Sequence, residues 1–298
     1  MNDAIAMSRW ALHIPGFDLA ELVSGLRPAP AVPPERARDL LGKRGLLATE
    51  PATRLALCAV HRALGLEPRE RPAGNPDPAS AVVASSNFGN ARAVASIAST
   101  LQRGDEKVSA LQAPNASSNV IASTVAIWFR CGAPSLMVCS GATGGLDAVA
   151  LAALLLRAGR ADRVIVVGAE PDDDFASRLN ALRPAAGPGR PLRAGSAAVV
   201  LERAGDGADG PCLGRVRSYA DPAGAVGHAR ADVLLGPDRL AAPGVRTIDL
   251  AHDVGDTFGA CGVIQLAVAA AFVAAGEARS VELTCGDEAD GWRTAVVS

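Results

Sequence analysis

Residues 136–159 read LMVCSGATGGLDAVALAALLLRAG, and this stretch decides the fold. Its apolar start, Leu136–Cys139, predicts a strand, and Leu146–Ala158 is long and apolar enough for a buried helix. A glycine-rich turn joins the two, and Arg163–Gly168 predicts a second strand beyond the helix. Strands without polar alternation are typical of a parallel sheet covered on both faces. The stretch therefore predicts a strand–helix–strand unit of an α/β protein.

The chain before this unit continues the same alternation. A helix is predicted near Pro51–Leu64, a buried strand at Ser80–Ser85, and a loop leading into a buried helix across Gln112–Trp128. Residues 1–50 are rich in proline and predict an edge strand with loops. Gly195–Glu202 predicts the strand that closes this half of the chain.

The second half begins near Pro211, and Gly262–Ala275 predicts its main helix. Strands are predicted at residues 212–220, 246–250, 281–285 and 294–298. The two long helices form an internal repeat. GLDAVALAALLLRAG ends at Gly159 and GVIQLAVAAAFVAAG ends at Gly276, which is an offset of 117 residues.

The repeat predicts two related βαβ halves in an αβαβα layered arrangement. We expect one half at residues 1–205 and a shortened half at residues 206–298. Because both repeated helices are apolar all round, they should lie side by side between two sheets.

The composition limits the partners that the chain can have. Of its 298 residues, 49% are hydrophobic and 20% charged, which favours a folded core over disorder. The formal net charge is -2 and the basic residues are spread along the chain, so nucleic acid is not expected as a partner. We find no signal-peptide pattern and no apolar run of membrane-spanning length, and therefore expect a cytoplasmic protein with reduced thiols and no membrane contact.

No cofactor or metal is expected. The six cysteines are scattered without a Cys-x-x-Cys pair. Gly141, Gly144 and Gly145 crowd one turn, but they match neither the dinucleotide-binding nor the P-loop pattern. The acidic run Asp172–Asp174 is interpreted as a solvated loop.

Five blocks of sequence point to a known family. They are RLALCAVHRALGL (54–66), VVASSNFGN (82–90), residues 119–170, GSAAVVLE (195–202) and VGDTFGACGVIQLAVA (254–269). In these blocks the chain resembles the ketosynthase branch of the thiolase superfamily. It is most similar to the chain length factor (ketosynthase beta) proteins that pair with type II polyketide ketosynthases. The resemblance implies a thiolase-like fold.

The resemblance assigns the position of the catalytic cysteine to Ala142. Active members carry C-[AT]-[ST]-G at this turn, and registering the chain on G-L-D-A places Ala142 there, followed by Thr143 and Gly144. A thiol at a helix N-terminus is made more acidic by the helix dipole and can attack an acyl thioester, whereas a methyl group cannot. The sequence TGGLDA is similar to the A-G-G-L-D-A of chain length factors. The nucleophile position is therefore degenerate.

The histidine positions are degenerate as well. Active members carry a histidine in G-H-x-x-G-A-x-G that stabilises the enolate formed on decarboxylation of malonyl thioesters. Here the block reads GDTFGACG (255–262) and places Asp256 there, whose charge would oppose an enolate. The family's H-G-T-G-T motif is absent, and ADVLLGPDRL (231–240) stands in its place. CGDEADGW (285–292) replaces a loop rich in phenylalanine and glycine.

An enzymatic interpretation stays open. An insertion in the alignment would place Cys139 in the nucleophile position, next to Ser140, and His252 could serve as its base. The chain would then be an atypical acyltransferase or condensing enzyme that uses Cys139 or Asp256. The alternative for these residues is structural, because cysteine often ends a buried strand and a lone histidine is often solvated.

The resemblance implies a catalytically degenerate subunit without independent activity. Its partners would be an active ketosynthase and an acyl carrier protein in polyketide or fatty-acid-like biosynthesis. We expect a dimer, hetero- or homomeric, formed through Asn115–Cys139, because this segment is poor in charge and costly to leave in water.

Overall fold

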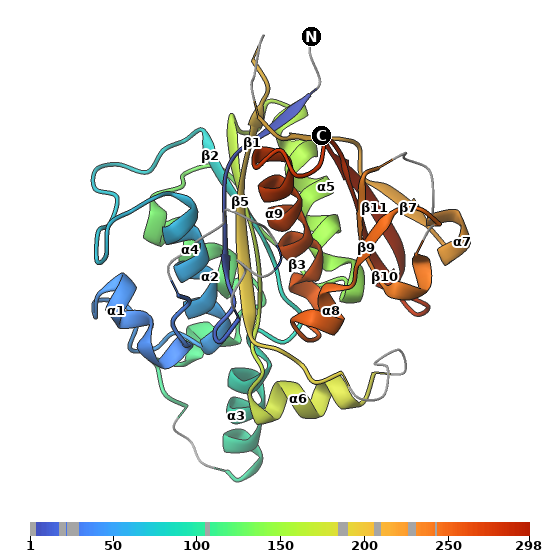
Figure 1. The fold of residues 1–298 in the computed structure, drawn as a ribbon. Helices are drawn as coiled ribbons and strands as arrows, with labels where there is room; N and C mark the ends of the chain where they lie inside the picture. The colour runs from blue at the N-terminus through green and yellow to red at the C-terminus, as the bar shows by residue number, and fades with distance from the viewer. Residues whose placement is uncertain are drawn as a thin grey trace.

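The computed structural model describes residues 4–17, 22, 30–104, 108–183, 190–205, 210–225, 231–241 and 243–298. The strands of these residues form one 11-stranded sheet, and helices lie on both sides of its first half (Figure 1). No helix in the described part of the chain has both the length and the apolar character required to cross a membrane.

The first half of the sheet has the strand order β3-β2-β4-β5-β1. Its strands are β1 (Ile5–His13), β2 (Ser80–Ser85), β3 (Ser135–Val138), β4 (Arg163–Glu170) and β5 (Gly195–Arg203). Strand β2 runs parallel to β3 and β4, whereas β5 is antiparallel to β4 and β1. All residues of β2 are buried, as expected for a parallel strand covered on both faces.

The second half repeats this order as β9-β8-β10-β11, followed by β6. Its strands are β6 (Cys212–Leu213), β7 (Arg217–Tyr219), β8 (Val233–Leu235), β9 (Arg246–Ile248), β10 (Val281–Asp287) and β11 (Gly291–Val297). Strand β8 runs parallel to β9 and β10, and β11 is antiparallel to β10, β6 and β7. The repeated order confirms the expected α/β, thiolase-like fold with two related halves.

Strand β6 joins the two halves, because it pairs with β1 on one side and with β11 on the other. The division into residues 1–205 and 206–298 stays a prediction, since residues 206–209 lie outside the described part of the chain.

The two repeated helices form the central layer. They are α5 (Gly144–Arg157) and α9 (Cys261–Ala274), and they lie side by side between the two halves of the sheet (Figure 1). Their backbones touch where both helices have glycine. A Cβ on Gly145 would lie 2.6 Å from the backbone nitrogen of Gly262, and one on Gly262 would lie 2.6 Å from that of Leu146. The expected central pair of helices is confirmed.

The outer layers of the two halves differ. Helices α1 (Ala37–Leu41), α2 (Pro51–Ala63) and α4 (Val120–Phe129) build a second core over the first half, opposite α5 and α9. Over the second half, the described residues contribute α7 (Pro222–Ala225) and a small cluster of Tyr219, Leu240 and the fully buried Trp292. Among the described residues, the second half therefore has less helical cover on its outer face than the first half.

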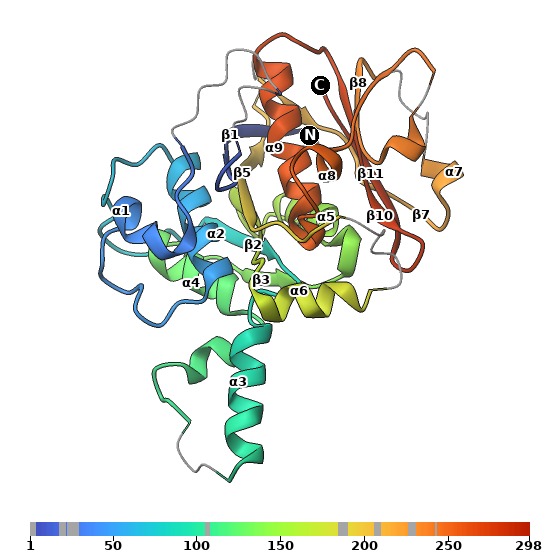
Figure 2. The same ribbon diagram turned by 60° about the horizontal axis from the view of Figure 1, so that its bottom comes forward.

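The remaining helices and 3-10 turns of the described residues connect the elements named above. They are α3 (Ala91–Gln102), α6 (Asp174–Ala181) and α8 (Leu250–Asp253), with the 3-10 turns η2 (Pro34–Arg36), η3 (Ala113–Ala116), η4 (Gly141–Thr143), η5 (Asp238–Leu240) and η6 (Phe258–Ala260). Helix α3 projects away from the rest of the molecule (Figure 2).

Three local expectations are corrected. The first strand is not an edge strand, because β1 pairs with β5 on one side and β6 on the other. The predicted strand at residues 212–220 is two strands, since the chain leaves β1 after β6 and continues along β11 as β7. The run Asp172–Asp174 is more than a solvated loop, because the Asp173 carboxylate accepts from the backbone N–H groups of Phe175 and Ala176 and caps α6.

Candidate functional site

The turn before α5 is held in one conformation by Asn87. Gly141 has φ +68°, a left-handed conformation that glycine adopts without strain. The Asn87 amide donates to the Gly141 carbonyl and accepts from the Gly141 N–H, each at 3.0 Å. The turn that carries Ala142 is therefore rigid before any ligand arrives.

The backbone N–H of Ala142 is hydrogen-bonded to a carboxylate. The Ala142 N–H donates to Oδ2 of Asp290 at 2.8 Å. Asp290 lies in the turn between β10 and β11, where its own N–H donates to the Asp287 carboxylate at 2.8 Å. Asp290 also fills the space beside Gly141 where a Cβ would stand. The N–H that could stabilise an oxyanion at this turn is thus already bonded to an anion.

Ser140 and Thr143 are bonded to Asp147 on the first turn of α5. Their hydroxyls donate to Asp147 Oδ2 at 2.6 and 2.7 Å, and the Arg293 guanidinium donates to Asp147 Oδ1 at 2.6 Å. The arrangement orients the Ser140 hydroxyl toward a carboxylate that is already paired with an arginine. This is the pattern of a structural network rather than of a nucleophile with a free base.

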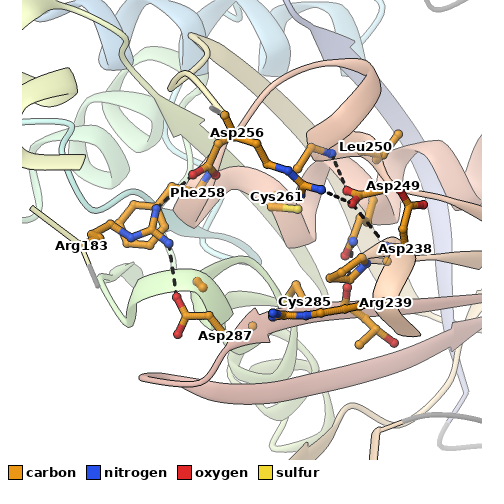
Figure 3. A pocket seen from close by; sticks show the side chains of 18 residues that line it. Arg183, Asp238, Arg239, Asp249, Leu250, Asp256, Phe258, Cys261, Cys285 and Asp287 are labelled. Atoms are coloured by element: carbon orange, nitrogen blue, oxygen red, sulfur yellow. Dashed lines mark hydrogen bonds and ion pairs between the residues drawn. The ribbon is translucent and has the colours of Figure 1, made fainter. Parts of the chain in front are cut away.

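Asp256 forms an ion pair with Arg183. Its Oδ2 lies 3.1 Å from Nη1 of Arg183, and its Oδ1 accepts from the Phe258 N–H at 2.8 Å. Nη2 of Arg183 also lies 3.3 Å from the Asp287 carboxylate, and the guanidinium stacks 3.4 Å from the centroid of the Phe258 ring (Figure 3). The charge of Asp256 is therefore balanced by a fixed arginine, an arrangement that the sequence did not indicate.

Ala142 and Asp256 line the same cavity, as the resemblance implies. The cavity has a volume of about 430 Å³ and is bounded by both halves of the chain (Figure 3). The stretch that replaces H-G-T-G-T also reaches it, through Gly236–Arg239 at the end of β8. Positions that the alignment identified separately are thus brought together by the fold.

The thiols in this cavity are not activated. Cys261 and Cys285 line it, and burial raises the pKa of Cys261 to about 12 and that of Cys285 well above its ordinary value. Since the thiolate is the reactive form, both side chains are walls of the cavity at neutral pH. Gln265 lines it too, and its amide donates to the carbonyls of Leu235 and Thr284.

The structure does not bring Cys139 and His252 together. Cys139 follows the edge strand β3 and is exposed, so the expected buried strand end is corrected. Partial desolvation and then the charge of Glu170 raise the pKa of its thiol. His252 lies on α8 with its side chain 74% exposed and 3.1 Å from the Asp253 carboxylate. Neither residue lines the cavity, and their catalytic roles stay a prediction.

Glu170 contacts both the loop that contains Asn87 and the turn that follows Asp256. It is fully buried at the end of β4 and accepts from the N–H groups of Asn87 and Phe88 at 2.6 and 3.1 Å and from the Ser86 hydroxyl at 3.1 Å. Burial raises its pKa to about 7, although these donors and the Gly259 N–H favour the carboxylate. One titratable group therefore links the Asn87 loop to the turn that follows Asp256.

Among the described residues, no group of three or more His, Cys, Asp or Glu side chains could hold a metal ion. All six cysteines are free. Sequence reasoning missed Asp290, Arg183 and Asp287. The only available signal was the acidic stretch CGDEADGW, whose contact with the Ala142 turn is not visible in the sequence.

Comparison with solved structures gives the fold independently. The ishigamide ketosynthase/chain length factor is 21% identical, with a TM-score of 0.75, and the match covers 99% of this chain and 99% of that chain. The AntDE:AntF complex, a type II PKS acyl-carrier protein with its ketosynthase, is 13% identical with a TM-score of 0.67, over 100% and 99%. The ketosynthase from module 1 of the bacillaene synthase of Bacillus amyloliquefaciens FZB42 is 14% identical with a TM-score of 0.66, over 100% and 73%.

No curated protein matches the sequence. A family model does: the beta-ketoacyl synthase N-terminal domain matches residues 37–204, which is more than half of the chain. The chain therefore belongs to the beta-ketoacyl synthase family.

Proposed function

We propose that this chain is a catalytically degenerate ketosynthase-like subunit of the chain length factor type, which pairs with an active ketosynthase. The observation that carries the proposal is the bond from the Ala142 N–H to Asp290. A condensing enzyme needs a nucleophile and an oxyanion donor at this turn. Here the nucleophile position has a methyl group and the donor is bonded to a carboxylate.

The second supporting observation is the pairing of Asp256 with Arg183. A group that stabilises an enolate must present a donor to the substrate. Asp256 presents an acceptor, and the neighbouring arginine is already shared between Asp256 and Asp287. The cavity thus keeps the place of a ketosynthase site and lacks its donors.

The edge of the first half supports a dimer through Asn115–Cys139. Strand β3 lies at the end of the sheet and pairs only with β2 among the described strands, so one row of its backbone groups is open to a partner strand. On the neighbouring α4, Ile127 is 76% exposed. Asn115–Cys139 contains Arg130 as its one charged residue, which favours burial against another protein.

We further propose that an acyl carrier protein meets the assembled pair. The basis is the fold alone, which this chain shares with a ketosynthase described in complex with its acyl-carrier protein. A cytoplasmic location remains part of the proposal. An independent acyltransferase using Cys139 or Asp256 gains no support, since the Cys139 thiol has a raised pKa and Asp256 is ion-paired.

Reconstitution with the ketosynthase encoded beside this chain tests the proposal. After co-expression, size-exclusion chromatography and native mass spectrometry should give a one-to-one complex. The isolated chain, incubated with acyl-carrier and malonyl-carrier thioesters, should give no acyl-enzyme and no condensation product. Condensation by the isolated chain that disappears in Cys139→Ala would contradict the proposal and support the enzymatic alternative.

A series of variants tests how the residues at positions 142, 256 and 290 each prevent condensation. Ala142→Cys alone should not condense, and Ala142→Cys with Asp256→His should remain weak. Adding Asp290→Asn to Ala142→Cys removes a negative charge beside the new thiol, so its alkylation by iodoacetamide should become about tenfold faster, the effect of one pKa unit. Equal alkylation rates with and without Asp290→Asn would show that Asp290 does not control this turn.

A further inference from the structure

A second cavity lies on the outer side of the first half, away from the site just described. It has a volume of about 540 Å³ and is formed by the C-terminal part of α4, the loop around Gly45 and the segment that begins at Arg71. Its charged lining is entirely basic: Arg44, Arg71 and Arg130. None of its lining residues is an Asp or Glu.

Among the described residues, the three guanidinium groups have no carboxylate partner, since none of them lies within 4.0 Å of an Asp or Glu oxygen. In the first cavity, by contrast, Arg183, Arg190 and Arg239 each pair with a carboxylate. Like charges without a counter-ion repel one another, and this cost is removed when an anion binds between them.

Two contacts fix the guanidinium group of Arg71 at the wall of the cavity. Its guanidinium stacks 3.4 Å from the centroid of the Trp128 ring and donates to the Arg44 carbonyl. Burial, and then the charge of Arg44, lower the pKa of Arg71. The protonated guanidinium is therefore less stable here than in water, and a bound anion would stabilise it. A guanidinium with a fixed plane loses little entropy when it binds an oxyanion.

Trp128, which carries the stacked Arg71, is itself mostly buried. Trp128 lines the cavity, is 8% exposed, and its indole N–H has no hydrogen-bond partner. An indole nitrogen can only donate, and a buried donor without an acceptor is destabilising. The polar side chains that line this cavity are Thr124, Trp128 and the three arginines, and the guanidinium groups are donors only.

We propose that this cavity binds the phosphate group of a phosphate ester. Three guanidinium groups suit the oxygens of phosphate, which arginine binds in bidentate geometry. The cavity is larger than one inorganic phosphate requires, and the exposed Ile127 beside it offers apolar contact for the organic part of an ester. The inference concerns the isolated chain, and its test uses the chain before pairing, because Ile127 and Arg130 also belong to the segment proposed to meet the ketosynthase.

The Trp128 indole gives a direct readout. The chain has three tryptophans, so a ¹⁵N-labelled sample shows three indole signals, and Trp128→Phe identifies the relevant one. At low ionic strength, where charge interactions are weakly screened, we would titrate inorganic phosphate and phenyl phosphate. The Trp128 signal should move and saturate while the signals of Trp10 and Trp292 stay in place, and phenyl phosphate should bind more tightly than inorganic phosphate.

Arginine variants test which groups hold the ligand. Arg71→Gln and Arg130→Gln should each weaken binding of phenyl phosphate by about tenfold, the effect of losing one charge-assisted hydrogen bond. Arg44→Gln serves as a second test that leaves the fold intact, because this side chain is exposed. Arg160→Gln, exposed and outside the cavity, is the control of equal charge change and should bind as the natural chain does.

Three results would contradict the proposal, two of them the site itself and one the class of ligand. One is a Trp128 signal that does not move up to about 10 mM of either compound, a concentration at which even a weak charge-assisted site is occupied. The other is an equal loss of affinity in Arg160→Gln and in the cavity variants, which would mean that only the net charge attracts the anion. Tighter binding of inorganic phosphate than of phenyl phosphate would overturn the assignment to an ester.

Discussion

The buried carboxyl of Glu170 makes the stability of the fold depend on pH. Its side chain lies at the end of β4 beneath the turn that carries Ala142, with no exposed surface. Burial raises its pKa from 4.5 to about 7 in the folded protein. Between these two values the folded chain holds a proton that the unfolded chain has lost, so stability must fall as the pH rises.

The magnitude follows from the size of the shift. One pKa unit corresponds to about 1.4 kcal/mol, so a shift from 4.5 to about 7 corresponds to about 3 kcal/mol. The free energy of unfolding should therefore decrease by about 3 kcal/mol as the pH rises from about 4.5 to about 7, and Glu170 should contribute no further change above that. Replacement by glutamine removes the titration. Because an amide N–H₂ faces donors where the carboxylate accepted, the variant also carries a fixed offset of about 1–3 kcal/mol, on which the pH-dependent difference is superimposed.

Urea unfolding of the natural chain and of Glu170→Gln between about pH 5 and 8.5 measures this dependence. His13, whose pKa burial lowers to about 4, destabilises both proteins as the pH falls below its ordinary value of 6.5. Only the difference between the two curves is therefore informative. Glu277→Gln, at an exposed position, is the control and should follow the natural chain. Parallel curves for Glu170→Gln and the natural chain would refute the reasoning.

Three other changes test the fold and the interface. Gly145→Ala places a Cβ 2.6 Å from the backbone of α9 and should lower the free energy of unfolding by about 1–3 kcal/mol in urea, whereas Gly205→Ala, with open space around it, should change it little. Leu136→Glu on the edge strand β3 should reduce assembly with the ketosynthase in size-exclusion chromatography, while Leu182→Glu, already 78% exposed, should not. Cys139→Ala should leave the condensing activity of the assembled pair unchanged, and a large loss of product by mass spectrometry would mean that this thiol takes part in the reaction.

The long apolar elements of the fold could be predicted from the sequence. The strand at Ser80–Ser85 has the predicted bounds, and the two glycine-led helices were found by their repeat. The strands that were missed or merged, β6, β7 and β8, have two or three residues each, which is too short for a periodic pattern. Their pairing depends on strands elsewhere in the chain: β6 pairs with β1, β7 with β11, and β8 with β10 and β9.

Within the site, only the residues that stand in a family motif could be predicted from the sequence. Ala142 and Asp256 each stand in a block that aligns with a family pattern, and the fold brings them to one cavity. Asp290 is 148 residues from Ala142, and Arg183 is 73 residues from Asp256. No local pattern relates residues at such separations, because their contact exists only after both halves have packed together.

The place of β1 has a consequence for synthesis on the ribosome. Ile5 pairs with Arg203 at one side and with Leu213 at the other, so β1 needs two strands that are synthesised about 200 residues later. At about 5–20 residues per second, translation takes roughly 10–40 seconds to reach those partners. During that interval the apolar side chains of β1 have no partner strand, so we expect this part of the fold to form only after β5 and β6 have been synthesised.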